Sequence, residues 1–203
     1  MARIYIDKPY VILVEGKLDE IILKLILNHL RSTHSNLMNK IEKTQIINIG
    51  GKDKLRSEAK VAIRLAIVRK KIEGLLIILD KDDNYQSTEQ RLINFLNNFP
   101  EIQIRDYLII PDENSEGQEL EDYLVVSLRE TDENRIQILD ECIRRVSNQR
   151  KIGKKLFFTY LLINDNCSYD GLSISEGILG KCVNVENLNL IKNRVLGFLG
   201  RVP

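Results

Sequence analysis

Four short apolar segments divide the first half of the chain, and each of them runs into a polar turn. The segments are residues 10–14, 45–49, 75–79 and 104–110. Apolar runs of this length, rich in Val, Ile and Leu, are typical of parallel strands that are buried on both faces. We therefore predict four β-strands, the third of which runs directly into Asp80.

Between these segments the apolar residues recur at the spacing of an amphipathic helix. We predict one helix after the first strand, a second over residues 53–71 and a third over residues 86–97. Strands that alternate with helices favour a parallel sheet with right-handed crossovers and helices on both faces. The expected fold class is therefore α/β, with a four-stranded, mainly parallel sheet.

The pattern changes after Pro111, because only helical periodicity follows. Helices are predicted over about residues 119–128, 132–148, 150–163 and 187–199. We expect an α/β domain of residues 1–111 and a helical extension of residues 112–203 that packs on it. With 203 residues, of which 43% are hydrophobic and 29% charged, the chain has a globular composition and enough length for a real core.

The composition also argues against membrane-spanning and secreted proteins. The apolar runs are much shorter than the roughly 20 residues of a membrane helix, and charges and a proline interrupt any signal-peptide core. The three cysteines, Cys142, Cys167 and Cys182, form no C-x-x-C pair and are typical of a reducing compartment. We therefore expect a cytoplasmic protein with no membrane contact.

A net charge of +1 conceals a strong asymmetry along the chain. Residues 1–74 carry 15 basic and 8 acidic side chains, whereas residues 75–141 carry 5 basic and 17 acidic ones. Residues 142–203 are basic again, with 10 basic and 4 acidic side chains. An acidic centre between basic flanks suits a metal-dependent enzyme that acts on phosphodiesters, although segregated helix surfaces explain the asymmetry as well.

Carboxylates follow two of the predicted strands directly. Glu15 comes after the first strand and precedes Gly16, and Asp80 and Asp82 come after the third. The carboxyl ends of parallel strands meet at one edge, where α/β proteins bind ligands. Asp80 and Asp82 alternate, so an extended backbone directs both to one side, where they can present oxygen ligands to Mg²⁺ or Mn²⁺. A simple Asp-rich turn is the competing interpretation.

Other carboxylates near these strand ends have an ordinary structural explanation. Asp19 and Glu20 fall in the first turn of a predicted helix, where the helix dipole favours negative charge. Glu121 and Asp122 follow a polar loop, and we interpret them as a helix start in preference to a second set of metal ligands.

Basic residues and glycines follow the second strand. Gly50 and Gly51 precede a predicted helix, so their N–H groups can face an anion, and Lys52 adds a positive charge. Lys52 and Arg56 begin a basic stripe at four-residue spacing along that helix. Gly51, Lys52 and Arg56 are therefore candidate phosphate-binding residues, with a tight turn and a solvated helix face as the alternatives. The stripe continues with Lys60 and Arg64, and a second basic run occupies residues 144–155.

Three of these segments together resemble the Toprim domain of topoisomerases, primases, recombination mediators and OLD nucleases. They are residues 14–20, residues 50–52 and residues 77–82, and the resemblance covers roughly residues 9–111. It implies a Rossmann-like Toprim fold in which Glu15 is a general acid/base or a metal ligand, and Asp80 and Asp82 bind Mg²⁺. The rest of the chain is similar to the tail of small stand-alone Toprim-like proteins of unknown function.

The first functional hypothesis is a small Toprim nuclease that cleaves DNA or RNA with Mg²⁺ or Mn²⁺. The second is a non-catalytic module that binds nucleic acid or assembles recombination and repair complexes on the same fold. A third, an enzyme that acts on a small phosphorylated substrate, lacks a recognisable base-binding motif. The sequence leaves open a homodimer or a protein partner.

Overall fold

The computed structural model describes residues 4–81, 84–113, 119–146, 152–164 and 173–203, together with Cys167 and Gly171. Of Arg56, Val126 and residues 129–132 it describes the backbone only. Asp82, one of the predicted metal ligands, lies outside the described residues. No helix in the described ranges is both long enough and apolar enough to cross a membrane.

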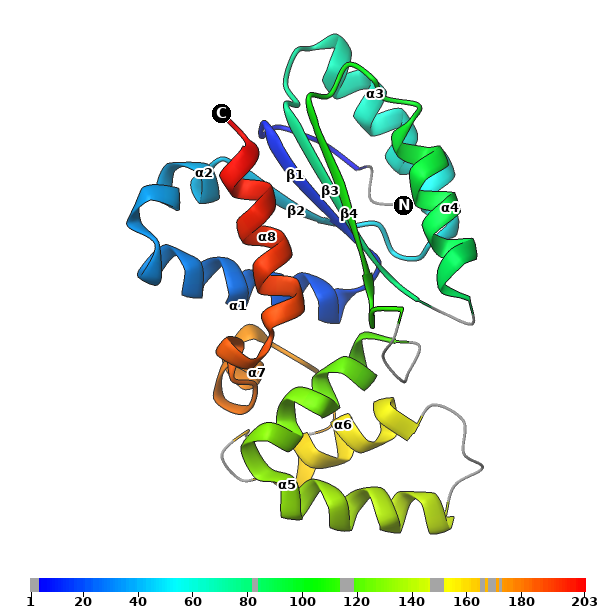
Figure 1. Ribbon diagram of the computed structural model, residues 1–203, viewed down its shortest axis with the longest axis vertical. Helices are drawn as coiled ribbons and strands as arrows, with labels where there is room; N and C mark the ends of the chain where they lie inside the picture. Colours follow the sequence, from blue (N-terminus) through cyan, green and yellow to red (C-terminus); the bar gives the residue numbers. More distant parts are fainter. Residues whose placement is uncertain are drawn as a thin grey trace.

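The four predicted strands form one parallel sheet, which confirms the α/β fold class (Figure 1). The strands are β1 (Tyr10–Val14), β2 (Thr44–Asn48), β3 (Gly74–Asp80) and β4 (Ile104–Ile110), and their order is β2-β1-β3-β4. In register, Val14 of β1 lies beside Asn48 of β2 and Ile78 of β3. β1 and β3 are therefore the central strands, and β2 and β4 are the edge strands.

Alternate residues of each strand belong to two separate apolar layers. In β1, Ile12 and Val14 face one layer, and Val11 and Leu13 face the other. All four side chains are fully buried. Burial on both faces explains why the strands contain apolar runs instead of alternating apolar and polar residues.

Helices α3 and α4 cover one face of the sheet, and α1 and α8 cover the other (Figure 1). The first face carries η2 (Leu55–Ala59, a turn of π-helix), α3 (Lys60–Val68) and α4 (Tyr85–Leu96). The other face carries α1 (Lys17–Thr33) and α8 (Asn189–Arg201). The short elements η1 (Ser35–Leu37) and α2 (Met38–Glu42) connect α1 to β2.

The helical extension differs from its prediction in two ways. The segments predicted as separate helices over 119–128 and 132–148 form one helix, α5 (Leu120–Val146), which packs against α6 (Ile152–Ile163). The structure also contains α7 (Glu176–Cys182) and η3 (Val185–Asn187), which the sequence pattern did not predict. Figure 1 shows α5 and α6 beyond the carboxyl edge of the sheet, whereas α8 returns to its face.

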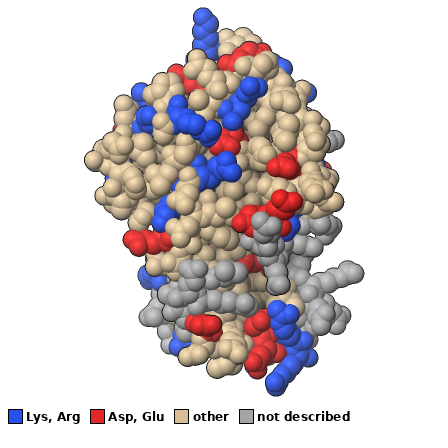
Figure 2. Space-filling model, viewed as in Figure 1, with Lys and Arg blue, Asp and Glu red and all other residues tan. Residues whose placement is uncertain are grey.

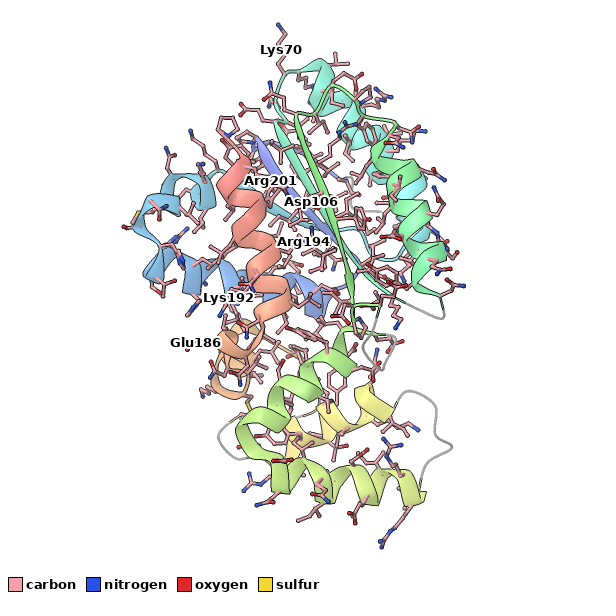
Figure 3. All side chains as sticks on the ribbon, in the orientation of Figure 1. Lys70, Asp106, Glu186, Lys192, Arg194 and Arg201 are labelled. Atoms are coloured by element: carbon pink, nitrogen blue, oxygen red, sulfur yellow. A yellow bond between two sulfur atoms is a disulfide. The ribbon has the colours of Figure 1, made fainter. Side chains whose placement is uncertain are left out.

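Helix α8 is held on the sheet by a buried aspartate of β4. Asp106 accepts a hydrogen bond from Arg194 at 3.1 Å and another from Arg201, both on α8 (Figure 3). At the start of β3, a Cβ on Gly74 would lie 2.8 Å from Val202, so only glycine allows this close approach. On the face that carries α8, Lys and Arg side chains gather over and around this helix (Figure 2).

Two of the cysteines are paired, although the sequence favoured three reduced ones. Cys167 and Cys182, separated by 15 residues, form a disulfide, and Cys142 is a free, exposed thiol. The disulfide joins the segment after α6 to the last residue of α7. Sequence spacing gave no indication of it because the two half-cystines meet only through the fold.

Candidate functional site

Glu15 and Asp80 lie at the topological switch point of the sheet, between the adjacent strands β1 and β3. Glu15 follows the last residue of β1, and Asp80 is the last residue of β3, the strand next to β1. The connection from β1 leads to β2 on one side, and β3 lies on the other side. Such a switch point at the carboxyl edge of a parallel sheet is where α/β proteins bind ligands.

Lys52 links Glu15 to Asp80. Its Nζ lies 3.5 Å from Glu15 Oε2 and donates a hydrogen bond of 2.7 Å to the backbone carbonyl of Asp80. The Lys52 side chain is only 9% exposed, so its charge is directed into the site. The structure therefore brings together three of the predicted site residues.

Asp19 belongs to the same cluster, which goes beyond its predicted role at a helix end. Its Oδ2 accepts a hydrogen bond of 3.0 Å from the N–H of Gly16, which caps α1. Its Oδ1 is buried and accepts no hydrogen bond from the residues that the structure describes. A buried carboxylate oxygen without a donor is costly, and a bound cation or a proton would remove that cost.

The start of α5 closes the site from the helical extension. The N–H of Leu120 donates to Asp80 Oδ1 at 3.0 Å, so the first turn of α5 lies on this carboxylate. The next residue, Glu121, is buried and lies 3.3 Å from Lys154 of α6. The interpretation of Glu121 as only a helix start is therefore incomplete, because α5 carries this carboxylate into the acidic site.

Crowding of negative charge shifts two of these carboxyls. Burial, and then the charges of Asp19, Glu15 and Glu121, raise the pKa of Asp80 to about 8, although Lys52 opposes the shift. Burial is also the main reason that the pKa of Asp19 rises to about 6. Such shifts are characteristic of functional sites, where charge is concentrated for a ligand or a reaction.

The glycine turn after β2 positions Lys52. Gly50 and Gly51 have φ values of +69° and +116°, which side-chain-bearing residues rarely adopt. The expectation that these N–H groups face an anion is wrong, because each is already donated within the chain. Gly50 donates to Asn48 Oδ1 at 2.8 Å and Gly51 to the Glu15 carbonyl at 3.1 Å. Gly51 therefore ties the turn to the end of β1.

The predicted basic stripe does not act as one surface. Lys52 lies in the acidic site, and Arg64 is engaged by the Glu101 carboxylate at 2.9 Å and by the Phe99 ring. Lys60 donates to the side chain of Asn98 at 3.2 Å. The Arg56 side chain is outside the described part of the chain, so its predicted role in phosphate binding stays a prediction.

The chemistry of the donor set fits a hard divalent cation. Glu15, Asp19 and Asp80 offer carboxylate oxygens, and the unbonded Oδ1 of Asp19 needs a positive partner. In the described residues, which do not include Asp82 and Asp83, no three Asp, Glu, His or Cys side chains are grouped closely enough to hold a metal. A complete metal site would therefore need Asp82 or a rearrangement of these carboxylates.

Comparison with known proteins assigns a family to the chain but no activity. Searches of curated proteins and of solved structures found no match. Residues 9–170 match the family described as "Protein of unknown function (DUF3226)". The match begins just before β1 and extends past α6, so it includes both the strand ends and the start of α5. The chain is therefore a member of the DUF3226 family.

Proposed function

We propose that this protein is a small Toprim-type nuclease that cleaves phosphodiester bonds in DNA or RNA with the help of Mg²⁺ or Mn²⁺. The observation that carries the proposal is the convergence of buried Asp19 and Glu121 with half-buried Glu15 and Asp80 at the switch point of the sheet. Repulsion between carboxylates this close together lowers the stability of the folded protein unless a cation offsets it. The Toprim resemblance of the same strand ends supports this choice of ligand.

Asp80 and Asp19 would hold the cation, with Asp82 completing the set and Glu15 at its border. A divalent cation in such a site stabilises the negative charge that develops on the reacting phosphate. Asp80 must lose its proton before it can bind the cation, and Lys52 favours that ionised form. The N–H of Leu120 keeps the Asp80 carboxylate in place.

Glu15 is the candidate for proton transfer, because it is only partly buried and lies at the open edge of the cluster. The Lys52 ammonium, 3.5 Å from Glu15 Oε2, would orient this carboxylate toward an attacking water. The same ammonium group would attract a phosphate oxygen of the substrate.

The proposal includes a location and a set of partners. A nucleic-acid substrate favours a cytoplasmic location, whereas the Cys167–Cys182 disulfide of the structure is typical of an oxidising compartment. The basic flanks of the acidic site would contact the nucleic-acid backbone. A homodimer or a protein partner stays a prediction, and a specific cleavage rate that rises with protein concentration would support the homodimer.

Cleavage of labelled single- and double-stranded DNA and RNA tests the proposal. Wild type should cleave at least one substrate with Mg²⁺ or Mn²⁺, and EDTA or Asp80→Asn should abolish the cleavage. Asp106→Asn is the matched control, because it makes the same chemical change in the neighbouring strand β4, away from the acidic site. Cation-independent binding without cleavage would contradict the nuclease proposal and favour a nucleic-acid binding module.

A further inference from the structure

Helix α3 exposes an apolar stripe to solvent. Val61, Leu65 and Val68 are 60%, 45% and 80% exposed, and their spacing of four and three residues places them on one side of the helix. They are three of the nine exposed large hydrophobic residues in the described part of the chain. A single exposed apolar residue is ordinary, whereas a continuous row of them marks an interaction surface.

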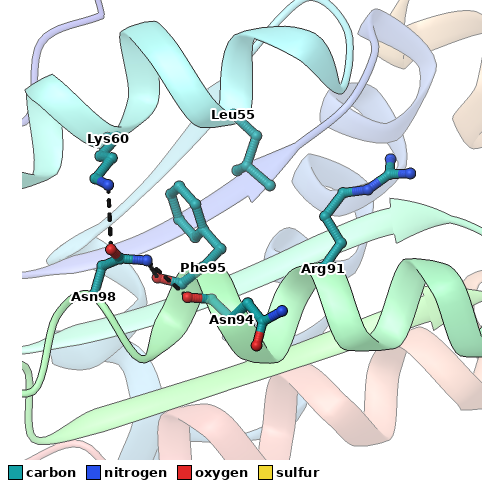
Figure 4. Close-up of a pocket in the computed structure, with 6 residues that line it drawn as sticks. All are labelled: Leu55, Lys60, Arg91, Asn94, Phe95 and Asn98. Atoms are coloured by element: carbon teal, nitrogen blue, oxygen red, sulfur yellow. Dashed lines mark hydrogen bonds between the residues drawn. The ribbon is translucent and has the colours of Figure 1, made fainter.

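The opposite side of α3 is already packed within the chain. Ala62, Ile63 and Ala66 are buried in the apolar layer between the helix and the sheet. On the side toward α4, Lys60 donates a hydrogen bond to Asn98 Oδ1 at 3.2 Å (Figure 4). Helix α3 is therefore apolar on two sides, and the fold of one chain covers only one of them.

Charges of opposite sign lie at the two ends of the stripe. Glu58 precedes Val61 by three residues, and the exposed Arg69 follows Leu65 by four. Residues at these spacings are neighbours on the surface of a helix. The stripe is therefore flanked by an acidic residue near its amino end and by a basic residue near its carboxyl end.

This arrangement is complementary to a second copy of itself. When two copies of α3 pack antiparallel about Leu65, Val61 of one copy lies opposite Val68 of the other. The same packing puts Glu58 beside Arg69 of the other copy, and it does so twice because a two-fold axis relates the copies. Antiparallel helices also place the positive end of one dipole beside the negative end of the other.

The pairing also brings the two Arg64 residues near each other, but their charge is already balanced. Arg64 lies 2.9 Å from the Glu101 carboxylate of its own chain, and its guanidinium lies over the Phe99 ring. Lys60 is directed toward Asn98 on the side of α4. Basic residues of α3 therefore do not prevent the contact.

We infer that the stripe of Val61, Leu65 and Val68 is the contact surface of a homodimer in which two α3 helices pack antiparallel. An interface of one helix from each copy buries roughly 1,000 Å² in total, so this dimer should dissociate at micromolar concentrations. Figure 1 shows α3 at the far end of the molecule from α5 and α6. Dimerisation therefore leaves the acidic site open, and the inference does not depend on the proposed function.

Sedimentation velocity over a range of protein concentrations tests the inference. Wild type should change from the monomer mass of 23.5 kDa toward twice that mass between about 1 and 100 μM. Leu65→Glu puts two like charges at the centre of the interface, so it should weaken association at least about 30-fold. Ile138→Glu is the matched control, because Ile138 is 64% exposed on α5, outside the stripe, and it should associate as wild type does.

Reversal of the flanking charges tests the direction of the two helices. Glu58→Arg and Arg69→Glu each convert two attractive pairs of the dimer into repulsive ones, so each should weaken association about tenfold. The double variant Glu58→Arg/Arg69→Glu restores opposite charges across the interface and should associate nearly as wild type does. Single variants that the double variant does not rescue would overturn the antiparallel arrangement.

The remaining outcomes decide whether the stripe binds a second copy at all. Association that Leu65→Glu retains, or that Ile138→Glu weakens equally, would overturn the interface. A wild type that stays monomeric over the whole range would overturn the dimer, and its binding to vesicles of equal parts phosphatidylcholine and phosphatidylserine would assign the stripe to a membrane surface. Circular dichroism confirms that Leu65→Glu is folded, and Val68→Glu, at the most exposed position of the stripe, repeats the test.

Discussion

Neighbouring strands of the sheet carry two aspartates whose surroundings have opposite charge: Asp106, which is buried, and Asp80, which is half-buried. Asp106 of β4 has two arginine partners from α8, which hold that helix on the sheet. Asp80 of β3 lies among Asp19, Glu15 and Glu121, with Lys52 as the cation that lowers its pKa. One carboxylate is neutralised by the fold itself, whereas the other is left in an acidic environment that a ligand can neutralise.

This difference distinguishes a carboxylate that stabilises the fold from one that is suited to bind a ligand. A buried carboxylate with matched cations contributes to the fold and has little reason to bind anything else. A buried carboxylate among others of its kind costs stability, and that cost is repaid when a cation binds. The two aspartates therefore provide each other's control in the measurements of cleavage, of stability without cations and of stabilisation by a cation.

The largest expected difference between them is in cleavage. Asp80→Asn should lower metal-dependent cleavage roughly 1,000-fold, as expected for the loss of a group that stabilises developing charge. Asp106→Asn should stay within about threefold of wild type when the protein is folded, because Asp106 lies within β4 and its partners are on α8, away from the acidic site. Initial rates at saturating Mg²⁺ measure both, and equal losses would remove the distinction.

Stability without divalent cations should change in opposite directions. The pKa of Asp80 is raised in the folded state, so this group favours folding most at low pH and loses that contribution as pH rises toward about 8. Asp80→Asn should therefore stabilise the protein at pH 8 by on the order of 2 kcal/mol. Asp106→Asn should destabilise it by roughly 1–2 kcal/mol, because the arginines lose their partner.

Urea unfolding in EDTA at pH 5 and pH 8 measures this contrast. The advantage of Asp80→Asn over wild type should be smaller at pH 5, where the folded wild type already carries the proton on Asp80. An Asp80→Asn protein that is less stable than wild type at pH 8 would argue against crowded negative charge in the site.

The affinity for a divalent cation should depend on pH, and Asp19 should affect the pH at which binding reaches its midpoint. Binding requires ionised Asp80, so Mn²⁺ affinity should rise up to about pH 8 and then level off. Asp19→Asn removes a proposed cation ligand, so Mn²⁺ should bind more weakly at every pH. It also removes one of the negative charges that raise the Asp80 pKa, so the midpoint of the remaining binding should move down by about one pH unit. Calorimetric titrations across this range give the midpoint, and Arg194→Met should leave it in place.

The smallest expected effect is that of Arg194→Met on stability. Arg194 is 44% exposed on its side chain, and Arg201 still holds Asp106 after the substitution. We expect a loss of about 0.5–1 kcal/mol, in the range of partly exposed ion pairs. A much larger loss in urea unfolding would mean that Arg194 anchors α8 nearly alone.

The sequence was sufficient to predict the sheet, because strands buried on both faces have a clear apolar pattern between turns. It was not sufficient for α5, where the stretch around Thr131 is polar on all sides and shows no helical period, so one helix was predicted as two. Helix α7 is short and escaped prediction for a related reason, since a few residues do not establish a periodicity.

The candidate site was predictable only where a residue follows a buried strand. Glu15 and Asp80 have that position, but Asp19 and Glu121 fall in the first turns of helices, where the dipole alone explains an acidic residue. Only packing shows that both are buried. The partners of Asp106 are 88 and 95 residues away, so no local pattern distinguishes it from Asp80.

The central claim is that the acidic site at the ends of β1 and β3 binds a divalent cation. The most direct test is the thermal unfolding of wild type, Asp80→Asn and Asp106→Asn at pH 8, with EDTA and with increasing Mg²⁺ or Mn²⁺. We predict that the cation raises the unfolding temperature of wild type and of Asp106→Asn but not of Asp80→Asn. An equal rise in all three proteins, or none in wild type, would contradict the claim.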